Sequence, residues 1–291
     1  MNKLKSPRIM FIASMITFGT LGLFVRNISV SSAELALYRA VLAMSLIGVF
    51  LLVTGQKIPF GKIKKEIPLL ILSGIAMGGD WIFFFEAYKY TTISIATLSY
   101  YFAPVIVIIV CPILFHEKLS VKQILCFVMS TLGIVMITGI GTSGTGKDII
   151  GIMFALGAAV LYASIILINK FIKNISGLHR TFLQFIAAIL VLLPYVLFTS
   201  GITLTSLNAV GWVNLLAVGL IHTGVAYCMY FASLEKLPGQ KAAILSYFDP
   251  LVAVILSVTV LGEPMTLMQV IGGVLILGFT LLNEISSKKN V

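Results

Sequence analysis

The chain has 291 residues, of which 59% are hydrophobic and 10% are charged, and its formal net charge is +10. An average soluble domain carries roughly a quarter charged residues. A chain with so few charges and a mean hydropathy of +1.09 cannot cover itself with polar surface, and a lipid bilayer is its natural solvent. This composition excludes a soluble enzyme, a nucleic-acid-binding protein and a small anchor that carries an aqueous domain.

Ten apolar runs follow one another along the chain, with short polar breaks between them. They span residues 8–28, 34–53, 67–88, 92–115, 121–140, 149–169, 179–199, 211–234, 239–261 and 266–284. A membrane-crossing helix needs about 20 apolar residues, so each run is long enough to cross. The runs are continuous rather than alternating, which excludes membrane strands. We therefore predict an all-α membrane protein with ten transmembrane helices.

The Lys and Arg residues predict how these helices are oriented. If successive helices cross in alternate directions, one side collects sixteen of the twenty Lys and Arg residues, and the other side collects Arg26, Lys89 and Lys147. Arg39 lies inside the second run. Because cytoplasmic loops are rich in Lys and Arg, we predict a multi-pass protein of the cytoplasmic membrane with both termini in the cytoplasm. The positive charge is then a topology signal and does not indicate a nucleic-acid partner.

The two halves of the chain repeat each other. A shift of 146 residues places Tyr101-Phe102-Ala103-Pro104 over Tyr247-Phe248-Asp249-Pro250 and pairs Glu117 with Glu263. Each half has five crossings, an odd number, so the second copy enters the membrane inverted, a common plan among transporters. We predict a first five-helix repeat at residues 1–140, an external linker at 141–148 and a second five-helix repeat at 149–291.

With these features the sequence resembles the ten-helix, EamA type of the drug/metabolite transporter superfamily. The resemblance rests on the 5+5 spans, on Tyr38-Arg39 early in the second span, and on the Pro-then-Glu ending of the fourth and ninth spans. It implies a permease, often an exporter, for small organic metabolites such as amino acids, with a central cavity between the halves. The first repeat has Ala103 where the second has Asp249, so the two halves of the cavity are not expected to be equivalent.

Two prolines lie inside spans, at equivalent places of the two repeats. Pro104 and Pro250 each remove a helix hydrogen bond and free the carbonyl four residues back, that of Tyr100 and that of Ser246. We predict kinked segments with a polar lining at the interface between the repeats. The alternative is a pair of packed kinks whose free carbonyls are satisfied by neighbouring helices.

Two ionisable residues lie near the middle of the second repeat's spans. An isolated charge at the depth of Asp249 costs at least ~2.5–3.5 kcal/mol, so this side chain is expected to face the interior of the helix bundle. There it is expected to bind a substrate amine or take up a proton. The alternative is a structural carboxylate. His222 titrates in a range that suits a proton relay, or it is a packing histidine. No second ligand lies at helical spacing from it, so no metal site is predicted.

Arg39 and Asp80 lie at similar depths, ~9 and ~12 Å from the outer ends of their spans at 1.5 Å per residue. Opposite charges at one depth usually pair, so we predict a buried charge pair, with substrate contact or gating as the alternative. Aromatic walls with a few polar groups suit small organic ligands. The predicted cavity residues are Tyr100, Tyr101, Ser246, Tyr247, Asp249, His222, Trp81 and Tyr227.

The predicted function is secondary transport, in the export direction, of a small organic solute by alternating access around the central cavity. The expected partners are that solute and the lipid bilayer, with protons as a candidate coupling ion, and no cofactor, metal or nucleic acid. No ATP-binding loop of the G-x-x-x-x-G-K-[ST] kind occurs. The alternatives are a facilitative channel and a non-transport intramembrane protein, such as an enzyme. An enzyme is not expected, because the three histidines are scattered along the chain.

Overall fold

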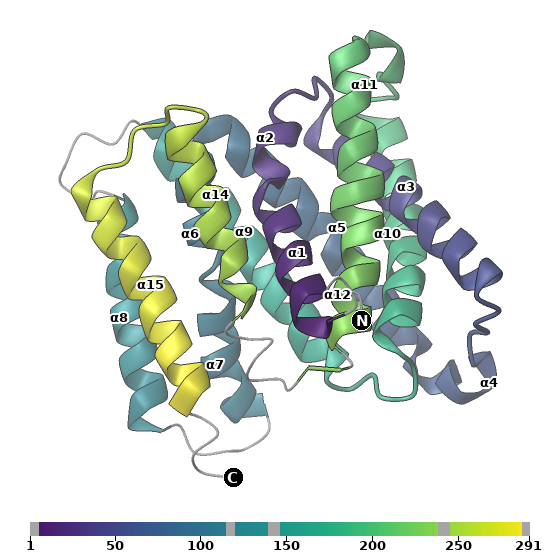
Figure 1. Cartoon of the computed structure of the whole chain (residues 1–291), viewed down its shortest axis with the longest axis horizontal. Helices are drawn as coiled ribbons and strands as arrows, with labels where there is room; N and C mark the ends of the chain where they lie inside the picture. Colours follow the sequence, from purple (N-terminus) through teal and green to yellow (C-terminus); the bar gives the residue numbers. More distant parts are fainter. Residues whose placement is uncertain (1–5, 115–119, 139–145, 235, 238–244, 287–291) are drawn as a thin grey trace.

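A computed structural model describes residues 6–114, 120–138, 146–234, 236–237 and 245–286, and within these residues the regular secondary structure is all helical, with no strand (Figure 1). The predicted linker at 141–148 lies mostly outside the described residues; its last three residues already belong to a helix. Seven helical stretches are long and apolar enough to cross a membrane, and three shorter apolar helices accompany them, at Val121–Ile137, Phe248–Thr259 and Leu267–Leu282. These helices occupy the ten predicted runs.

The first repeat contains five crossings. They are α1 (Pro7–Gly19) with α2 (Leu21–Val25), α3 (Ser32–Val53), α5 (Ile67–Tyr90), α6 (Ile93–Tyr100) with α7 (Ala103–Leu114), and α8 (Val121–Thr138). A short helix α4 (Phe60–Ile63) and a 3₁₀ turn (Lys64–Glu66) lead into α5.

The second repeat follows the same plan. Its crossings are α9 (Gly146–Asn169), α10 (Gly177–Thr199), α11 (Ala209–Leu216) with the π-helical segment η4 (Ala217–Val225) and α12 (Ala226–Leu234), α14 (Phe248–Thr259) and α15 (Leu267–Ser286). A 3₁₀ turn, η3 (Leu204–Ser206), precedes α11.

Local chemistry sets where the helices begin and end. Ser31 caps α3 in a reciprocal pair with Glu34, in which the Glu34 amide donates to Ser31 Oγ over 3.1 Å and the Ser31 amide donates to Glu34 Oε2 over 3.2 Å. Gly55 follows α3 and Gly201 follows α10, with φ of 67° and 68°. Only glycine adopts this left-handed conformation without strain, so each stops its helix. The two glycines lie at the repeat spacing that also relates Tyr101 to Tyr247.

The helices of the two repeats pack in matching ways. Helix α9 packs on α5, α6 and α7, and its counterpart α1 packs on η4, α12 and α14. Helix α10 packs on α5, and its counterpart α3 packs on η4. Three pairs of counterparts also touch each other directly: α3 with α10, α6 with α14, and α8 with α15. These contacts thus have their counterparts in the other half, and the first helix of each repeat packs on the other repeat.

Helices α8 and α15 form a close pair at one flank of the bundle (Figure 1). They meet at two glycines: a Cβ atom added to Gly133 would lie 2.6 Å from the carbonyl oxygen of Gly272, and one added to Gly272 would lie 2.5 Å from that of Gly133. Small residues allow helices in a membrane to approach this closely.

Helix α1 begins and α15 ends on the same side of the bundle, as an even number of crossings requires (Figure 1). We call this the terminal side and the opposite one the distal side.

Candidate functional site

A cavity of about 620 Å³ lies between the two repeats. Its walls come from α1, α2, α3, α5, α6, α7, α9, α10, α12 and α14. Asp80 and Asp249 line it near the middle of the bundle, and Asn169 and Arg180 line it at helix ends on the terminal side. The cavity therefore extends from the midplane toward the terminal side.

Both tyrosines of the repeated motif lie at breaks in their helices. Tyr101 and Phe102 form the turn that separates α6 from α7, immediately before Ala103-Pro104. Tyr247 forms the corresponding turn before α14, in which Pro250 is the third residue. Since a proline cannot bond to the carbonyl four residues back, each break leaves polar backbone near the centre of the membrane.

The break in the first repeat reaches the polar groups of the second. The Tyr101 hydroxyl donates to Asp249 Oδ2 over 2.9 Å, and it also lies 3.4 Å from the Ser246 carbonyl oxygen, the group freed by Pro250. The rings of Tyr101 and Tyr247 lie 6.5 Å apart. One hydroxyl thus connects the two halves where their helices are interrupted.

The neighbouring tyrosine approaches the other carboxylate. The Tyr100 hydroxyl donates to Asp80 Oδ2 over 3.4 Å, a long hydrogen bond. Asp80 is 3% exposed, and its Oδ1 has no hydrogen-bond partner among the described residues. Tyr100 and Tyr101 are consecutive, so one turn of chain places a hydroxyl beside each of the two aspartates of the cavity.

The direct ion pair predicted between Arg39 and Asp80 does not form, although both side chains are buried and line the same cavity. The ion pairs of the described residues join other groups. Arg39 donates through Nε to Thr223 Oγ1 over 2.7 Å, and its guanidinium lies 4.3 Å from the centre of the Trp81 ring. The guanidinium is thus in contact with a π face and a hydroxyl, while its attraction to the carboxylate acts without direct contact.

His222 lies outside the lining of the central cavity. It is buried in η4, with Nε2 at 2.9 Å from Thr20 Oγ1 and Nδ1 at 3.0 Å from the Ala217 carbonyl oxygen. The Ala217 carbonyl can only accept, so Nδ1 donates to it, while the Thr20 hydroxyl lies within hydrogen-bond distance of both His222 Nε2 and, at 2.8 Å, the Thr17 carbonyl oxygen. His222 therefore ties the second repeat to the first crossing.

The predicted cavity residues divide into two groups. Six of them line the central cavity: Trp81, Tyr100, Tyr101, Tyr227, Ser246 and Asp249. His222 and Tyr247 lie outside its lining. Pro104 lines it too, while the buried Pro250 lies outside the lining.

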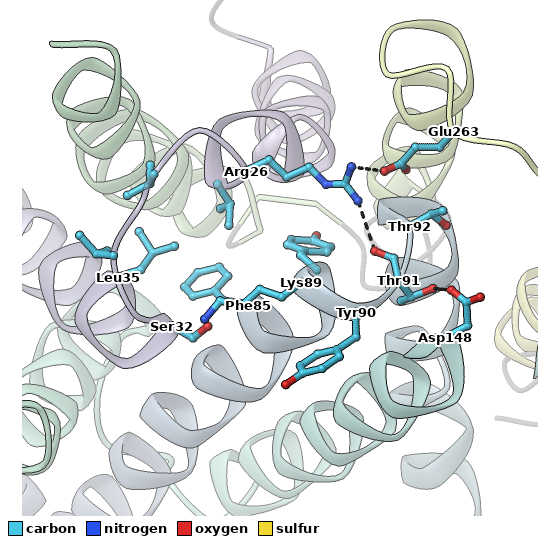
Figure 2. Close-up of a pocket in the computed structure, with 14 residues that line it drawn as sticks. Arg26, Ser32, Leu35, Phe85, Lys89, Tyr90, Thr91, Thr92, Asp148 and Glu263 are labelled. Atoms are coloured by element: carbon cyan, nitrogen blue, oxygen red, sulfur yellow. Dashed lines mark hydrogen bonds and ion pairs between the residues drawn. The ribbon is translucent and has the colours of Figure 1, made fainter. Parts of the chain in front are cut away.

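A second hollow, of about 610 Å³, lies at the distal end (Figure 2). We call it the distal hollow; its lining includes Arg26, Tyr90, Asp148 and Glu263. Among the described residues, Tyr88 is the one side chain that lines both the distal hollow and the central cavity. Tyr88 is buried, with its ring 4.7 Å from that of Phe84. It thus lies in the wall between the two hollows.

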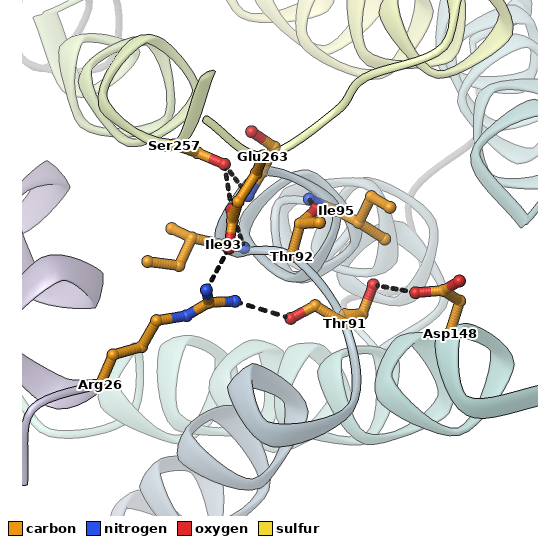
Figure 3. Close-up of polar contacts among 9 residues, drawn as sticks. Arg26, Thr91, Thr92, Ile93, Ile95, Asp148, Ser257 and Glu263 are labelled. Atoms are coloured by element: carbon orange, nitrogen blue, oxygen red, sulfur yellow. Dashed lines mark hydrogen bonds and ion pairs between the residues drawn. The ribbon is translucent and has the colours of Figure 1, made fainter. Parts of the chain in front are cut away.

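A polar network joins four helical segments at the distal end (Figure 3). Arg26, after α2, forms an ion pair with Glu263 and donates to the Thr91 carbonyl oxygen over 3.2 Å. The Thr91 hydroxyl donates to Asp148 Oδ1, at the start of α9, over 3.0 Å. We call Arg26, Thr91, Asp148 and Glu263 the distal network.

Glu263 is the centre of this network. Besides Arg26, it accepts from the Ile93 amide over 2.9 Å, at the start of α6, and from the Ser257 hydroxyl of α14. The helices below it are also closely packed: a Cβ atom on Gly22 would lie 2.6 Å from the Ile93 side chain. Charge and packing therefore both join α2 to α6 at the distal end.

Several of these residues escape prediction from sequence. Glu263 stands out in the sequence because it matches Glu117 of the first repeat. Arg26 stands out because it is one of three cations on its side of the predicted topology. Neither feature predicts that the two residues form an ion pair. Tyr88, Arg180 and Tyr162, which also lines the central cavity, carry no sequence signal that separates them from packing residues. The position of Glu117 lies outside the described residues.

The model of the EamA-like transporter family matches residues 6–139 and 149–284. Among curated proteins, an uncharacterized transporter, YxxF, of Bacillus subtilis (strain 168) is 31% identical over 278 residues, which cover 94% of this chain and 88% of that protein. An uncharacterized transporter of Archaeoglobus fulgidus is 26% identical and covers 93% of each chain.

A relative with a more specific name is the probable amino-acid metabolite efflux pump of Salmonella typhimurium, 25% identical over 247 residues, which cover 80% of this chain and 82% of that protein. A crystal structure with a TM-score of 0.66 and 16% identity covers 97% of this chain and 98% of its own, and it bears on the fold alone.

Proposed function

Since this chain belongs to the EamA-like transporter family, we propose that it is a secondary transporter that exports small organic metabolites, such as amino acids, across the cytoplasmic membrane. The observation that carries the proposal is the position of the cavity. It lies between two inverted repeats, reaches one side of the bundle, and is separated from the other side by Tyr88 and the distal network. Such an arrangement suits alternating access, in which the repeats rock around a fixed central site.

The charge distribution supports the direction of loading. Because sixteen of the twenty Lys and Arg residues belong to the terminal side of the predicted topology, we infer that this side faces the cytoplasm. The structure then represents an inward-open state with its external end closed. An exporter loads from the cytoplasm in this state and releases its solute after the distal network separates.

The cavity and one relative support the substrate class. A volume of about 620 Å³ falls within the range of pockets that hold small organic molecules. The lining combines aromatic rings with Asp80, Asp249 and Arg180, which suits a solute with both charged and apolar parts. The Salmonella relative is named a probable amino-acid metabolite efflux pump, and we extend that class to this chain.

The energy source in this proposal is the proton gradient. Asp249 lies on the cavity wall, where a carboxylate can exchange its proton with one side of the membrane at a time. Flux in liposomes is therefore expected to rise with an imposed pH gradient and to lose this dependence in Asp249→Asn. If flux through the unaltered protein does not depend on the pH gradient, proton coupling is contradicted and facilitated diffusion is the remaining mechanism.

The test of the proposed function is reconstitution of the purified protein in liposomes loaded with radiolabelled amino acids. We expect saturable efflux that shows counterflow, meaning that labelled solute accumulates transiently on the side that holds an excess of unlabelled solute. A channel would give unsaturable flux without counterflow.

Variants of the distal network test the role of the structure in this transport. Arg26→Gln and Glu263→Gln are each expected to lower the maximal rate of efflux. The loss of rate in the double variant is expected to be smaller than the two single losses combined, because the two charges act on each other.

A further inference from the structure

The buried carboxylate of Asp80 lacks a counter-charge in direct contact. The side chain is 3% exposed, Oδ2 has one long hydrogen bond from Tyr100, and Oδ1 has no hydrogen-bond partner among the described residues. A buried charge is costly unless it is paired, and an acceptor without a donor adds to that cost. Asp80 lies on the wall of the central cavity and its Oδ1 is covered there, so a donor from the cavity reaches this oxygen when neighbouring side chains move aside.

The nearest candidate counter-ion in the wall is already engaged. Arg39 donates through Nε to Thr223, and its guanidinium rests over the Trp81 ring at 4.3 Å, with the Phe85 ring at 5.5 Å. No ion pair between Arg39 and Asp80 is present among the described residues. The two charges attract each other through the cavity wall, but the free oxygen of Asp80 is left for a donor that comes from the cavity.

The surroundings of Asp80 suit an organic cation rather than a bare metal ion. The ring of Tyr100 lies 4.4 Å from that of Phe84 and 5.4 Å from that of Tyr162, so a continuous aromatic wall extends beside the carboxylate. Ring faces attract ammonium groups and bury the carbon atoms attached to them. Within the described residues, no group of three His, Cys, Asp or Glu side chains is arranged to hold a metal ion.

We propose that the solute of this transporter carries a protonated amine, and that the free Oδ1 of Asp80, beside the rings of Phe84, Tyr100 and Tyr162, is the group that binds it. The inference rests on the proposed function and specifies its substrate class. Asp249 differs from Asp80 because the Tyr101 hydroxyl bonds it over 2.9 Å. The amine is required for binding, and a carboxylate on the same solute is not.

The test uses binding, which does not depend on transport. Thermal unfolding of the purified full-length protein in detergent is measured with eight probes, four on a phenyl and four on a butyl frame: amine alone, amine with carboxylate, carboxylate alone, and alcohol. We expect amine-bearing probes of at least one frame to raise the unfolding temperature in a saturable way. The carboxylate-only and alcohol probes are expected to leave it unchanged.

Asp80→Asn keeps the shape of the side chain and removes its charge, so it should fold. It is expected to weaken the apparent affinity for the amine by about 10- to 100-fold, the range of a hydrogen bond to a charged group. Glu86→Gln is the matched control, since it removes a carboxylate from the same helix outside the central cavity. Asp80→Glu, which restores the charge, is expected to recover part of the binding.

Three results would overturn the proposal: no response to any amine, an equal response to the carboxylate-only probes, or unchanged amine affinity in Asp80→Asn. Proteoliposome flux separates this failure from failure of the proposed function. Saturable transport of an anionic or neutral solute without an amine would refute the role of Asp80 and keep the transporter. Amine binding lost in Asp80→Asn, in a protein that moves no solute, would support the amine site and refute the transport proposal.

Discussion

The Tyr101 hydroxyl joins the broken helix of the first repeat to Asp249 of the second. Tyr101→Phe removes this donor and leaves the ring in place. Because hydrogen bonds to charged groups contribute about 1.5–3 kcal/mol, we expect the half-saturating solute concentration to rise roughly tenfold in proteoliposome flux. Tyr195→Phe is the matched control, since its side chain is exposed and belongs to neither hollow. Equal kinetics for Tyr101→Phe and the control would show that this contact has no part in solute binding.

His222 gives a second prediction at the level of one residue, because both of its ring nitrogens have partners within the protein. His222→Leu leaves the Thr20 hydroxyl and the Ala217 carbonyl without their ring contacts. Loss of such buried hydrogen bonds costs about 1–3 kcal/mol, so the thermal unfolding temperature in detergent is expected to fall. The dependence of flux on the pH gradient should persist in the folded fraction. A variant of normal stability that has lost its response to pH would instead assign His222 to a proton relay.

Most of the candidate residues could be predicted from the repeat or from the cost of burying charge. Asp80 and Asp249 stand out because a carboxylate within an apolar run needs a reason, and Tyr101 stands out because its motif occurs twice. Arg39 stands out for the same reason, and it lines the same cavity as Asp80 without direct contact between the two charges. The position of a residue along a helix predicts its depth in the membrane, but it does not predict the direction in which the side chain points around the helix axis. The sequence therefore could not show that the Arg39 side chain contacts Thr223 and the face of Trp81.

At the scale of elements, the close approach of the end of the first crossing to α6 makes a distinct prediction. A Cβ atom on Gly22 would lie 2.6 Å from the Ile93 side chain, so Gly22→Val should act as a wedge that loosens the closed distal end. We expect an impermeant thiol reagent outside the cell to label a cysteine at Thr97, on the cavity wall, several-fold faster in this variant. The native Cys111, Cys126 and Cys228 are replaced by alanine beforehand.

Gly61→Val is the control for this wedge, because nothing lies within 4 Å of a Cβ atom at Gly61, in the short helix α4. Labelling at Thr97 should stay at the background rate there. If Gly22→Val labels no faster than Gly61→Val, the packing between Gly22 and Ile93 does not keep the distal end closed.

The elements themselves were largely predictable, because a bilayer leaves few choices for a backbone that must satisfy its own hydrogen bonds. What the apolar runs could not reveal is where a helix changes its winding. The fourth crossing is divided at Tyr101 and Phe102, as the proline that follows suggests, but η4 contains no proline. In this π-helical segment the Thr223 hydroxyl donates to the Val218 carbonyl oxygen, five residues back. The same hydroxyl accepts a hydrogen bond from Arg39. That arrangement depends on a neighbour from the other repeat.

At the scale of the whole molecule, the two repeats exchange their first helices. Helix α1 packs on α12 and α14 of the second repeat, and α9 packs on α5 and α6 of the first. Neither repeat therefore closes its own core. In alternating access, α1 and α9 are expected to remain attached to the opposite repeat while the cavity changes the side to which it opens, because leaving these contacts would expose buried residues such as Phe11 and Ala155.

This exchange predicts that the chain can be cut between its repeats without coming apart. A protease site inserted into the predicted linker at 141–148 is cleaved after the protein has been assembled and purified. The two fragments are expected to elute together from size exclusion and to retain solute flux, because the contacts of α1 and α9 with the opposite repeat are buried and do not depend on the connection. A second site beside Gly55, between α3 and α4, provides the comparison, since that cut falls within one repeat. Separation of the linker-cut fragments in mild detergent would mean that each repeat is stable alone and that the exchanged helices contribute little to holding the molecule together.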